Sequence, residues 1–195
     1  GLGDVYKRQH IDWLNKFQSL AKTPLLISMD AEWGPSQRLS DVFAHPWNMT
    51  LGAIQDDSLV REISKRMAEQ NKALGVHFNF SPSVDVNNNS KNPIIGNRSF
   101  GEDPNNVYNK AKAYIQGHKD VGVYTSIKHF PGHGDTDKDS HKTLPVISGN
   151  MKRLNDVELF PFKRLIDDGL AESVMLAHLS VPAIDKNYPS SLSSK

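Results

Sequence analysis

The sequence of 195 residues contains no cysteine, and this absence excludes several classes of protein. A disulfide scaffold, a cysteine-ligated zinc or iron–sulfur site and a thiol nucleophile all require cysteine. An excess of one charge is also missing, because 23 Lys and Arg side chains stand against 22 Asp and Glu side chains. The net charge of +1 gives no overall field that would attract nucleic acid or an anionic membrane. We therefore expect neither a nucleic-acid partner nor a membrane partner.

Long hydrophobic runs are missing as well. No apolar segment approaches the roughly 20 residues that a membrane-spanning helix needs. The first residues do not form an export signal, although the sequence leaves both the cytoplasm and the periplasm open as compartments. The Gly-x-Gly-x-x-Gly fingerprint of dinucleotide-binding folds and the Walker A loop are absent too. These patterns give no reason to expect a cofactor.

The sequence does contain an alternation of helical and strand-like patterns. Apolar side chains recur at helical spacing in the segments 10–20, 56–74, 103–115 and 154–168. Shorter apolar runs, which we expect to be strands, lie at 25–29, 76–80, 121–127 and 172–177. In the second helical segment Leu59, Ile63 and Met67 recur every fourth residue and are expected to share the buried face. The alternation predicts a parallel sheet built from βαβ units.

Local signals predict where several elements begin and end. Asp103 followed by Pro104 is typical of a helix N-cap and first turn, and Gly75 of a helix C-terminus. Pro161 is expected to break the last helical segment or to begin a second helix. We expect the polar segment 128–145 to be a long loop.

Polar residues follow one predicted strand after another, and this favours a barrel over an open sheet. They are Asp30 and Glu32, then Asp85, then the Lys128–His129 pair, and His178. In a (β/α)8 barrel all strand carboxyl ends open onto one face, where catalytic groups collect. A complete barrel takes roughly 250 residues. We therefore predict an α/β fold that is a partial (β/α)8 TIM barrel, truncated on its C-terminal side.

The segment 128–141 is the densest polar cluster, with three histidines and three aspartates. Asp135, Asp137 and Asp139 have the spacing of a calcium loop, but Ser140 replaces the required glycine and Val146 the required glutamate. A zinc site on His129, His133, Asp137 and His141 stays open, as does a merely solvated loop. The third interpretation is acid–base catalysis, because Asp139 can orient the imidazole of His141, which titrates near neutrality.

Four ordered segments of this sequence resemble glycoside hydrolase family 3, in its β-N-acetylhexosaminidase branch. Lys128-His129-Phe130-Pro131-Gly132-His133-Gly134, followed by Asp139-Ser140-His141, is similar to the family's signature. Ser28-Met29-Asp30-Ala31-Glu32-Trp33-Gly34 resembles its acidic segment after a strand, and Asn97-Arg98-Ser99-Phe100-Gly101-Glu102-Asp103-Pro104 resembles another signature. The match covers most of the chain.

The resemblance implies roles for individual residues. Asp139 and His141 would be the catalytic dyad, with His141 acting first as general acid and then as general base. The sugar in the first subsite would be held by Asp30, Arg38, Arg98, Lys128 and His129. Their chemistry suits this task, because a carboxylate accepts hydrogen bonds from hydroxyls and Arg or Lys donates them.

Simpler interpretations of the same residues stay open. Asp30 could cap a helix, Arg98 could pair with Glu102, and Arg38 is matched mainly by its distance from Asp30. We expect Glu32 to be structural. The resemblance implies no metal ion and no cofactor.

The implied activity is retaining hydrolysis of terminal β-linked N-acetylglucosamine from glycans such as peptidoglycan fragments. The alternatives are a β-glucosidase-type enzyme of the same family, a β-N-acetylglucosaminide phosphorylase, an inactive carbohydrate-binding fragment and a metal-dependent hydrolase. The family's aspartate nucleophile is expected beyond Lys195, since the segment 188–195 resembles the stretch before it. Residues 1–9 do not resemble the family, so we expect a non-native segment there and an incomplete barrel domain over 10–195. The sequence does not predict the oligomeric state.

Overall fold

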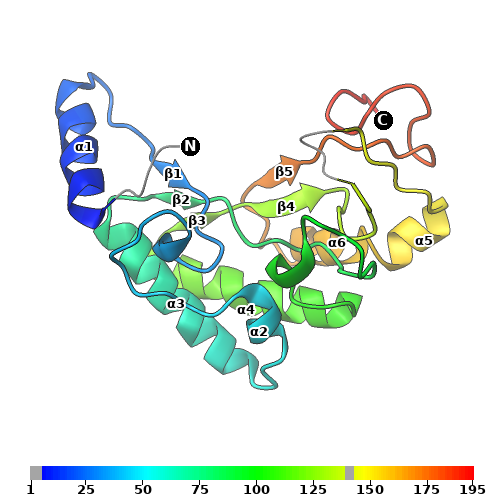
Figure 1. Cartoon of the computed structure of the whole chain (residues 1–195), viewed down its shortest axis with the longest axis horizontal. Coiled ribbons are helices and arrows are strands. Elements are labelled where there is room, and N and C mark those ends of the chain that lie inside the picture. The colour runs from blue at the N-terminus through cyan, green and yellow to red at the C-terminus, as the bar shows by residue number, and fades with distance from the viewer. Residues whose placement is uncertain (1–5, 139–142) are drawn as a thin grey trace.

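The computed structural model describes residues 6–138 and 143–195 (Figure 1). The helices are α1 (Lys7–Leu20), α2 (Asn48–Gly52), α3 (Asp57–Ala73), α4 (Pro104–Val121), α5 (Met151–Asp156) and α6 (Phe160–Asp167). Two short 3-10 helices are η1 (Pro35–Gln37) and η2 (Gly96–Arg98). The strands are β1 (Ser28–Met29), β2 (Phe78–Asn79), β3 (Tyr124–Thr125), β4 (Ile127–Phe130) and β5 (Val174–Leu176). None of the helices in the described part of the chain is long and apolar enough to span a membrane.

The strands form two parallel sheets, one of order β1-β2-β3 and one of order β4-β5. Only Ser126 separates β3 from β4, and its backbone N–H lies 3.0 Å from the oxygen of Ser81. One continuous segment therefore belongs to both sheets. Helices α3, α4 and α6 lie along the same side of these strands (Figure 1). This arrangement of parallel strands and crossover helices confirms the predicted α/β fold, and the described residues do not close into a barrel.

The helix α4 begins where the sequence predicts. The Asp103 carboxylate accepts a hydrogen bond from the Asn106 backbone at 2.7 Å, and Pro104 occupies the first turn. Its expected inward residues, among them Tyr114 and Ile115, are buried in the main core. At Gly117 a Cβ atom would lie 2.4 Å from the carbonyl oxygen of Arg61, so only glycine allows α3 and α4 to approach this closely.

The buried face of α3 differs from the predicted one. Met67 is buried as expected, but Leu59 is 49% exposed. The buried stripe includes Ser64, whose hydroxyl donates a 2.6 Å hydrogen bond to the Tyr114 carbonyl. Apolar periodicity missed this face because a polar side chain with a partner on α4 lies in the middle of it.

Two predicted strands also have different bounds. The run 25–29 is a strand only at Ser28–Met29, and Leu26 is 67% exposed because β1 is an end strand of its sheet. The run 121–127 continues as β4 to Phe130, so Lys128 and His129 lie on a strand rather than in the expected loop. Pairing of Lys128 with Met175 of β5 fixes this extension. The expected break near Pro161 is confirmed, because Pro161 stands in the first turn of α6.

Candidate active site

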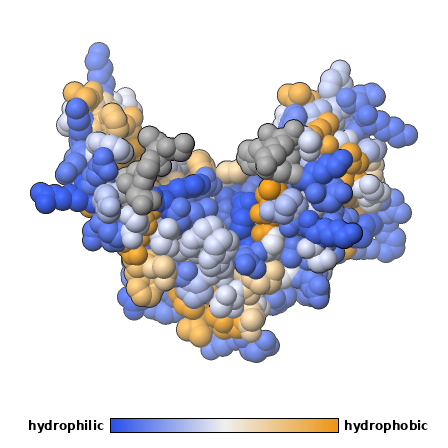
Figure 2. Space-filling model, in the orientation of Figure 1, coloured by the Kyte–Doolittle hydropathy of each residue, from blue (hydrophilic) through white to orange (hydrophobic). Residues whose placement is uncertain are grey.

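A cavity of about 810 Å³ opens at the carboxyl ends of the strands. Its walls come from the segment after β1, from η2, from β4 and from the segment 175–178 around the end of β5. Figure 2 shows the molecule hollowed at its upper edge, with hydrophilic residues at the bottom of the hollow. In a parallel α/β fold this end of the strands is where ligands bind.

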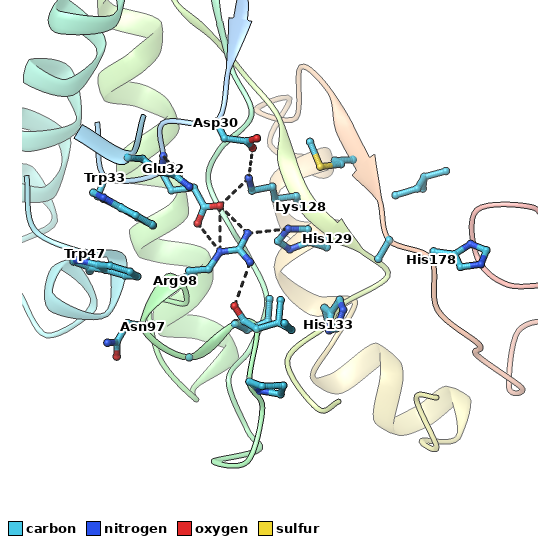
Figure 3. Close-up of a pocket in the computed structure, with 18 of the residues that line it drawn as sticks. Asp30, Glu32, Trp33, Trp47, Asn97, Arg98, Lys128, His129, His133 and His178 are labelled. Carbon is cyan, nitrogen blue, oxygen red and sulfur yellow. Dashed lines mark hydrogen bonds and ion pairs between the residues drawn. The ribbon is translucent and has the colours of Figure 1, made fainter. Parts of the chain in front are cut away.

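An ion-pair network occupies the floor of the cavity (Figure 3). The Lys128 ammonium lies 2.9 Å from Asp30 and 2.8 Å from Glu32. The Arg98 guanidinium binds both oxygens of Glu32, at 2.7 and 3.0 Å. Arg38 reaches the outer oxygen of Asp30 at 3.0 Å. Four of the five residues that the sequence assigns to sugar binding thus belong to this network, and the fifth, His129, contacts Arg98.

These contacts exclude two of the simpler interpretations. Arg98 pairs with Glu32 rather than with Glu102, and Asp30 pairs with Lys128 and Arg38 rather than capping a helix. Glu32 is 1% exposed and joins Arg98 to Lys128, so it positions both cations. The sequence predicts that Glu32 is structural. It does not predict that Glu32 also lines the cavity.

Both carboxylates of the network stay ionised. Burial by itself would raise the pKa of Glu32, but the hydrogen bonds and charges of Arg98 and Lys128 outweigh it and hold this pKa below its usual value. Burial would also raise the pKa of Asp30. The charges and hydrogen bonds of Lys128 and Arg38 outweigh this effect, so the pKa of Asp30 also lies below its usual value. Asp30 is the more exposed of the two and is the acceptor that a ligand can reach.

The fifth predicted residue, His129, is held by Asp85. Its Nδ1 lies 2.7 Å from the Asp85 carboxylate, and its Nε2 lies 3.1 Å from Nη2 of Arg98. Because a guanidinium only donates, Nε2 must be the acceptor and Nδ1 must carry the proton. The tautomer of His129 is therefore set from both sides.

The sequence singles out Asp85 only as a polar residue after a strand and assigns it no role. Its carboxylate is fully buried and also accepts hydrogen bonds from the His133 backbone at 2.6 Å and from Ser83 at 2.7 Å. Burial would raise the pKa of Asp85, but His129 and these hydrogen bonds hold it far below its usual range. Asp85 is thus a permanent anion beneath the cavity.

A neutral polar network holds the other side of the site. The Asn79 side chain bonds both the N–H and the carbonyl of Ala31, each at 3.0 Å. The Tyr114 hydroxyl lies 3.0 Å from the Glu32 carbonyl, and burial raises the pKa of Tyr114, so this hydroxyl remains a donor. His118 stacks on Tyr114, and burial lowers the pKa of His118 to about 3. All of these groups are neutral at pH 7.

The predicted dyad, Asp139 and His141, lies outside the described residues. The zinc hypothesis also depends on His141, and the described part of the chain contains no group of three or more metal-ligating side chains. In addition, both ring nitrogens of His129 already have protein partners. The geometry therefore gives this hypothesis no support.

Two tryptophans that the sequence did not assign form one wall of the cavity. Trp33 and Trp47 stack with their ring centroids 3.9 Å apart. Trp33 directly follows the acidic segment, which is the signal that could have identified it.

Comparisons with known proteins match this chain to one family. A family model described as the glycosyl hydrolase family 3 N terminal domain matches residues 6–195. Beta-hexosaminidase A of Pseudoalteromonas piscicida is 36% identical over 87% of this chain and 29% of its own length. Beta-hexosaminidase of Nitrosomonas eutropha is 39% identical over 91% of this chain and 52% of its own length.

Among solved structures, a glycoside hydrolase family 3 β-N-acetylglucosaminidase from Paenibacillus sp. str. FPU-7 superposes with a TM-score of 0.91. It is 40% identical, and the match covers 97% of this chain and 37% of that one. The chain thus spans about half, or less, of the length of these relatives. The expectation that residues 1–9 are non-native stays a prediction.

Proposed function

Since this chain belongs to glycoside hydrolase family 3, as its N-terminal domain, we propose that it forms the sugar-binding side of a retaining β-N-acetylhexosaminidase site. The substrate would be a glycan with a terminal β-linked N-acetylglucosamine, such as a peptidoglycan fragment. The observation that carries the proposal is the ion-pair network of Asp30, Glu32, Arg98 and Lys128 on the cavity floor.

The network suits a polyhydroxylated ring. Asp30 is ionised and partly exposed, so its oxygens can accept hydrogen bonds from neighbouring hydroxyls. Lys128 gives two donors to Asp30 and Glu32, which leaves its third proton for a sugar hydroxyl. The fixed positions of these groups mean that binding costs little reorganisation.

We assign the proton transfers to His141, oriented by Asp139. In the first step a carboxylate nucleophile bonds to the anomeric carbon while His141 protonates the departing glycosidic oxygen. In the second step water attacks the same carbon and gives its proton to His141. This attack breaks the bond to the carboxylate and releases it. No residue of this chain is assigned as the nucleophile, which we expect from a further part of the protein.

A chromogenic β-N-acetylglucosaminide tests the proposal, measured on this chain and on a chain extended to the length of its relatives. We expect turnover in the extended chain and a loss of about 100-fold or more in His141→Ala and Asp139→Ala. Lys152→Ala, at an exposed position on α5, is the control and should leave turnover unchanged.

The outcomes separate the alternatives. Unchanged turnover in both dyad variants would remove the dyad assignment. Binding of N-acetylglucosamine without turnover in either chain would indicate a carbohydrate-binding protein. Preference for a β-glucoside would indicate the other branch of the family, and a sugar 1-phosphate formed only in phosphate buffer would indicate phosphorolysis.

A further inference from the structure

One wall of the cavity is aromatic, and the network of charged residues does not account for it. Trp33 and Trp47 stack nearly in parallel, with an angle of 15° between their rings. In Figure 3 they lie on one side of the Glu32–Arg98 pair, whereas His129 lies on the other side. Trp47 is 44% exposed, although it is among the largest apolar side chains in the protein. An exposed aromatic wall next to a charged floor points to a ligand with both apolar and polar faces.

The aromatic wall is fixed to the charged floor through the backbone. Gly34, which follows Trp33, has a φ of +83°, and a Cβ atom there would lie 2.8 Å from the His45 ring. His45 stands two residues before Trp47, so this close approach joins the two tryptophan segments. Asn48, the next residue after Trp47, donates a 2.8 Å hydrogen bond to the Arg98 carbonyl. The stacked pair is therefore preformed at a set position relative to Arg98.

Saccharide rings combine the two properties that this cavity offers. Their hydroxyl edges suit the ionised groups, and their C–H faces suit the flat face of an indole. A cavity of about 810 Å³ also has room beyond a single sugar ring, since pockets of about 300–1,000 Å³ enclose much larger ligands. A unit at the aromatic wall could be continuous with a unit on the floor, because Trp33, Trp47 and Asp30 line the same cavity.

We propose that Trp33 and Trp47 form a second saccharide subsite, which binds the neighbouring unit of a β-linked oligosaccharide. The proposal rests on the proposed function in one respect, namely that the charged floor holds a sugar. The second subsite makes a disaccharide or longer glycan, rather than a monosaccharide, the preferred ligand of this cavity. The contact is stacking, so it contributes affinity with little dependence on salt.

Intrinsic fluorescence of the full chain tests this directly. The sequence has three tryptophans, and Trp13 lies on α1 outside the cavity, so Trp13→Phe leaves only the stacked pair as reporters. In this background we would titrate N-acetylglucosamine and N,N′-diacetylchitobiose, and in parallel glucose and cellobiose. We expect the favoured disaccharide to bind about fivefold to tenfold more tightly than its monosaccharide.

Variants of the wall provide the comparison. Trp47→Leu keeps an apolar side chain but removes the flat face, and Trp33→Phe keeps a smaller ring. We expect Trp47→Leu to abolish the preference for the disaccharide while the monosaccharide affinity changes by less than about twofold. Trp33→Phe should reduce the preference partially. Thermal unfolding and near-ultraviolet circular dichroism establish whether each variant is folded. If Trp47→Leu does not fold, Trp33→Phe alone is the test variant.

The titrations distinguish a wrong second subsite from a wrong proposed function. If the disaccharide binds no more tightly than its monosaccharide, or if a variant weakens the binding of both sugars equally, the second subsite is overturned. The proposed function then stays intact. An advantage seen with cellobiose but not with diacetylchitobiose supports the subsite and contradicts the N-acetylglucosamine specificity. Absence of binding by all four sugars contradicts both.

Discussion

The two sides of the cavity are held in place by opposite kinds of interaction. We call the Asp30–Glu32 side the neutral side, because uncharged groups support it. Asn79 and Tyr114 fix its backbone around Ala31. The Lys128–His129 side is the charged side, because a buried anion supports it. The Asp85 carboxylate binds the His129 ring and backbone and the His133 backbone. The charged side should therefore be the more sensitive to substitution, whereas the neutral side contains His118, whose pKa burial lowers to about 3.

The largest effect is expected on the charged side. Asp85→Asn removes a buried charge and places an amide N–H group among donors, so it should lower the free energy of unfolding by about 3–5 kcal/mol. Asp120→Asn is the matched control, because Asp120 pairs with Arg61 at the surface, and it should cost less than about 1 kcal/mol. Denaturant unfolding measures both. Equal losses in the two variants would contradict the assigned role of Asp85.

Acid should destabilise the neutral side through His118. The pKa of His118 is lowered to about 3, so between its ordinary value of 6.5 and about 3 the unfolded state binds a proton that the folded state does not. Stability is therefore complete above pH 6.5 and falls with decreasing pH, by at most about 1.4 kcal/mol per pH unit. The carboxylates Asp30 and Glu32 have lowered pKa values, so their contribution is lost only near and below their ordinary values of 3.8 and 4.5.

The variant His118→Gln tests the contribution of His118 to this pH dependence. It keeps hydrogen-bonding groups near Ser64 and Asn79 but cannot titrate. Unfolding measured between pH 6.5 and 5 should show a slope in the parent chain and a flatter line in the variant. A slope that persists unchanged in His118→Gln would assign the acid sensitivity to another group.

A smaller loss of stability is expected when the neutral side loses one hydrogen-bond donor. Tyr114→Phe removes the hydroxyl that bonds the Glu32 carbonyl and leaves the ring in the core, so it should cost about 1–2 kcal/mol. Tyr124→Phe, at an exposed tyrosine on β3, is the control and should change stability by less than about 0.5 kcal/mol. Thermal unfolding compares the two.

The smallest effect on stability is expected at the rim. Arg38 and Asp30 are both partly exposed, so Arg38→Ala should change the free energy of unfolding by less than about 1 kcal/mol. If Arg38 contacts the sugar, the same variant should weaken N-acetylglucosamine binding severalfold in a titration. A large loss of stability with unchanged sugar affinity would show that Arg38 is structural.

The sequence placed Asp30, Arg98 and Lys128 in one site because each belongs to a short motif that resembles the family, and the structure brings these three side chains to the cavity floor. It predicted the start of α4 for a similar reason, since Asp103 and Pro104 act within a single turn. It missed the role of Asp85, because its partners His129 and His133 are more than 40 residues away along the chain. No local pattern distinguishes such a carboxylate from a solvated one.

The aromatic wall and the α3 face were missed for related reasons. Trp33 and Trp47 meet only because Gly34 lets the His45 segment approach. The buried face of α3 contains Ser64, which apolar periodicity counts as exposed although α4 supplies its partner. In each case the deciding contact joins segments whose proximity only the fold creates.

The continuity of β3 and β4 through Ser126 has a mechanical consequence. Asp30 follows a strand of the three-stranded sheet, whereas Lys128 lies on a strand of the two-stranded sheet. The 2.9 Å ion pair between them therefore connects a residue of one sheet with a residue of the other. A ligand that binds Asp30 or Lys128 would contact the same two side chains that connect the sheets at the cavity, so the floor of the cavity is also part of the connection between the sheets.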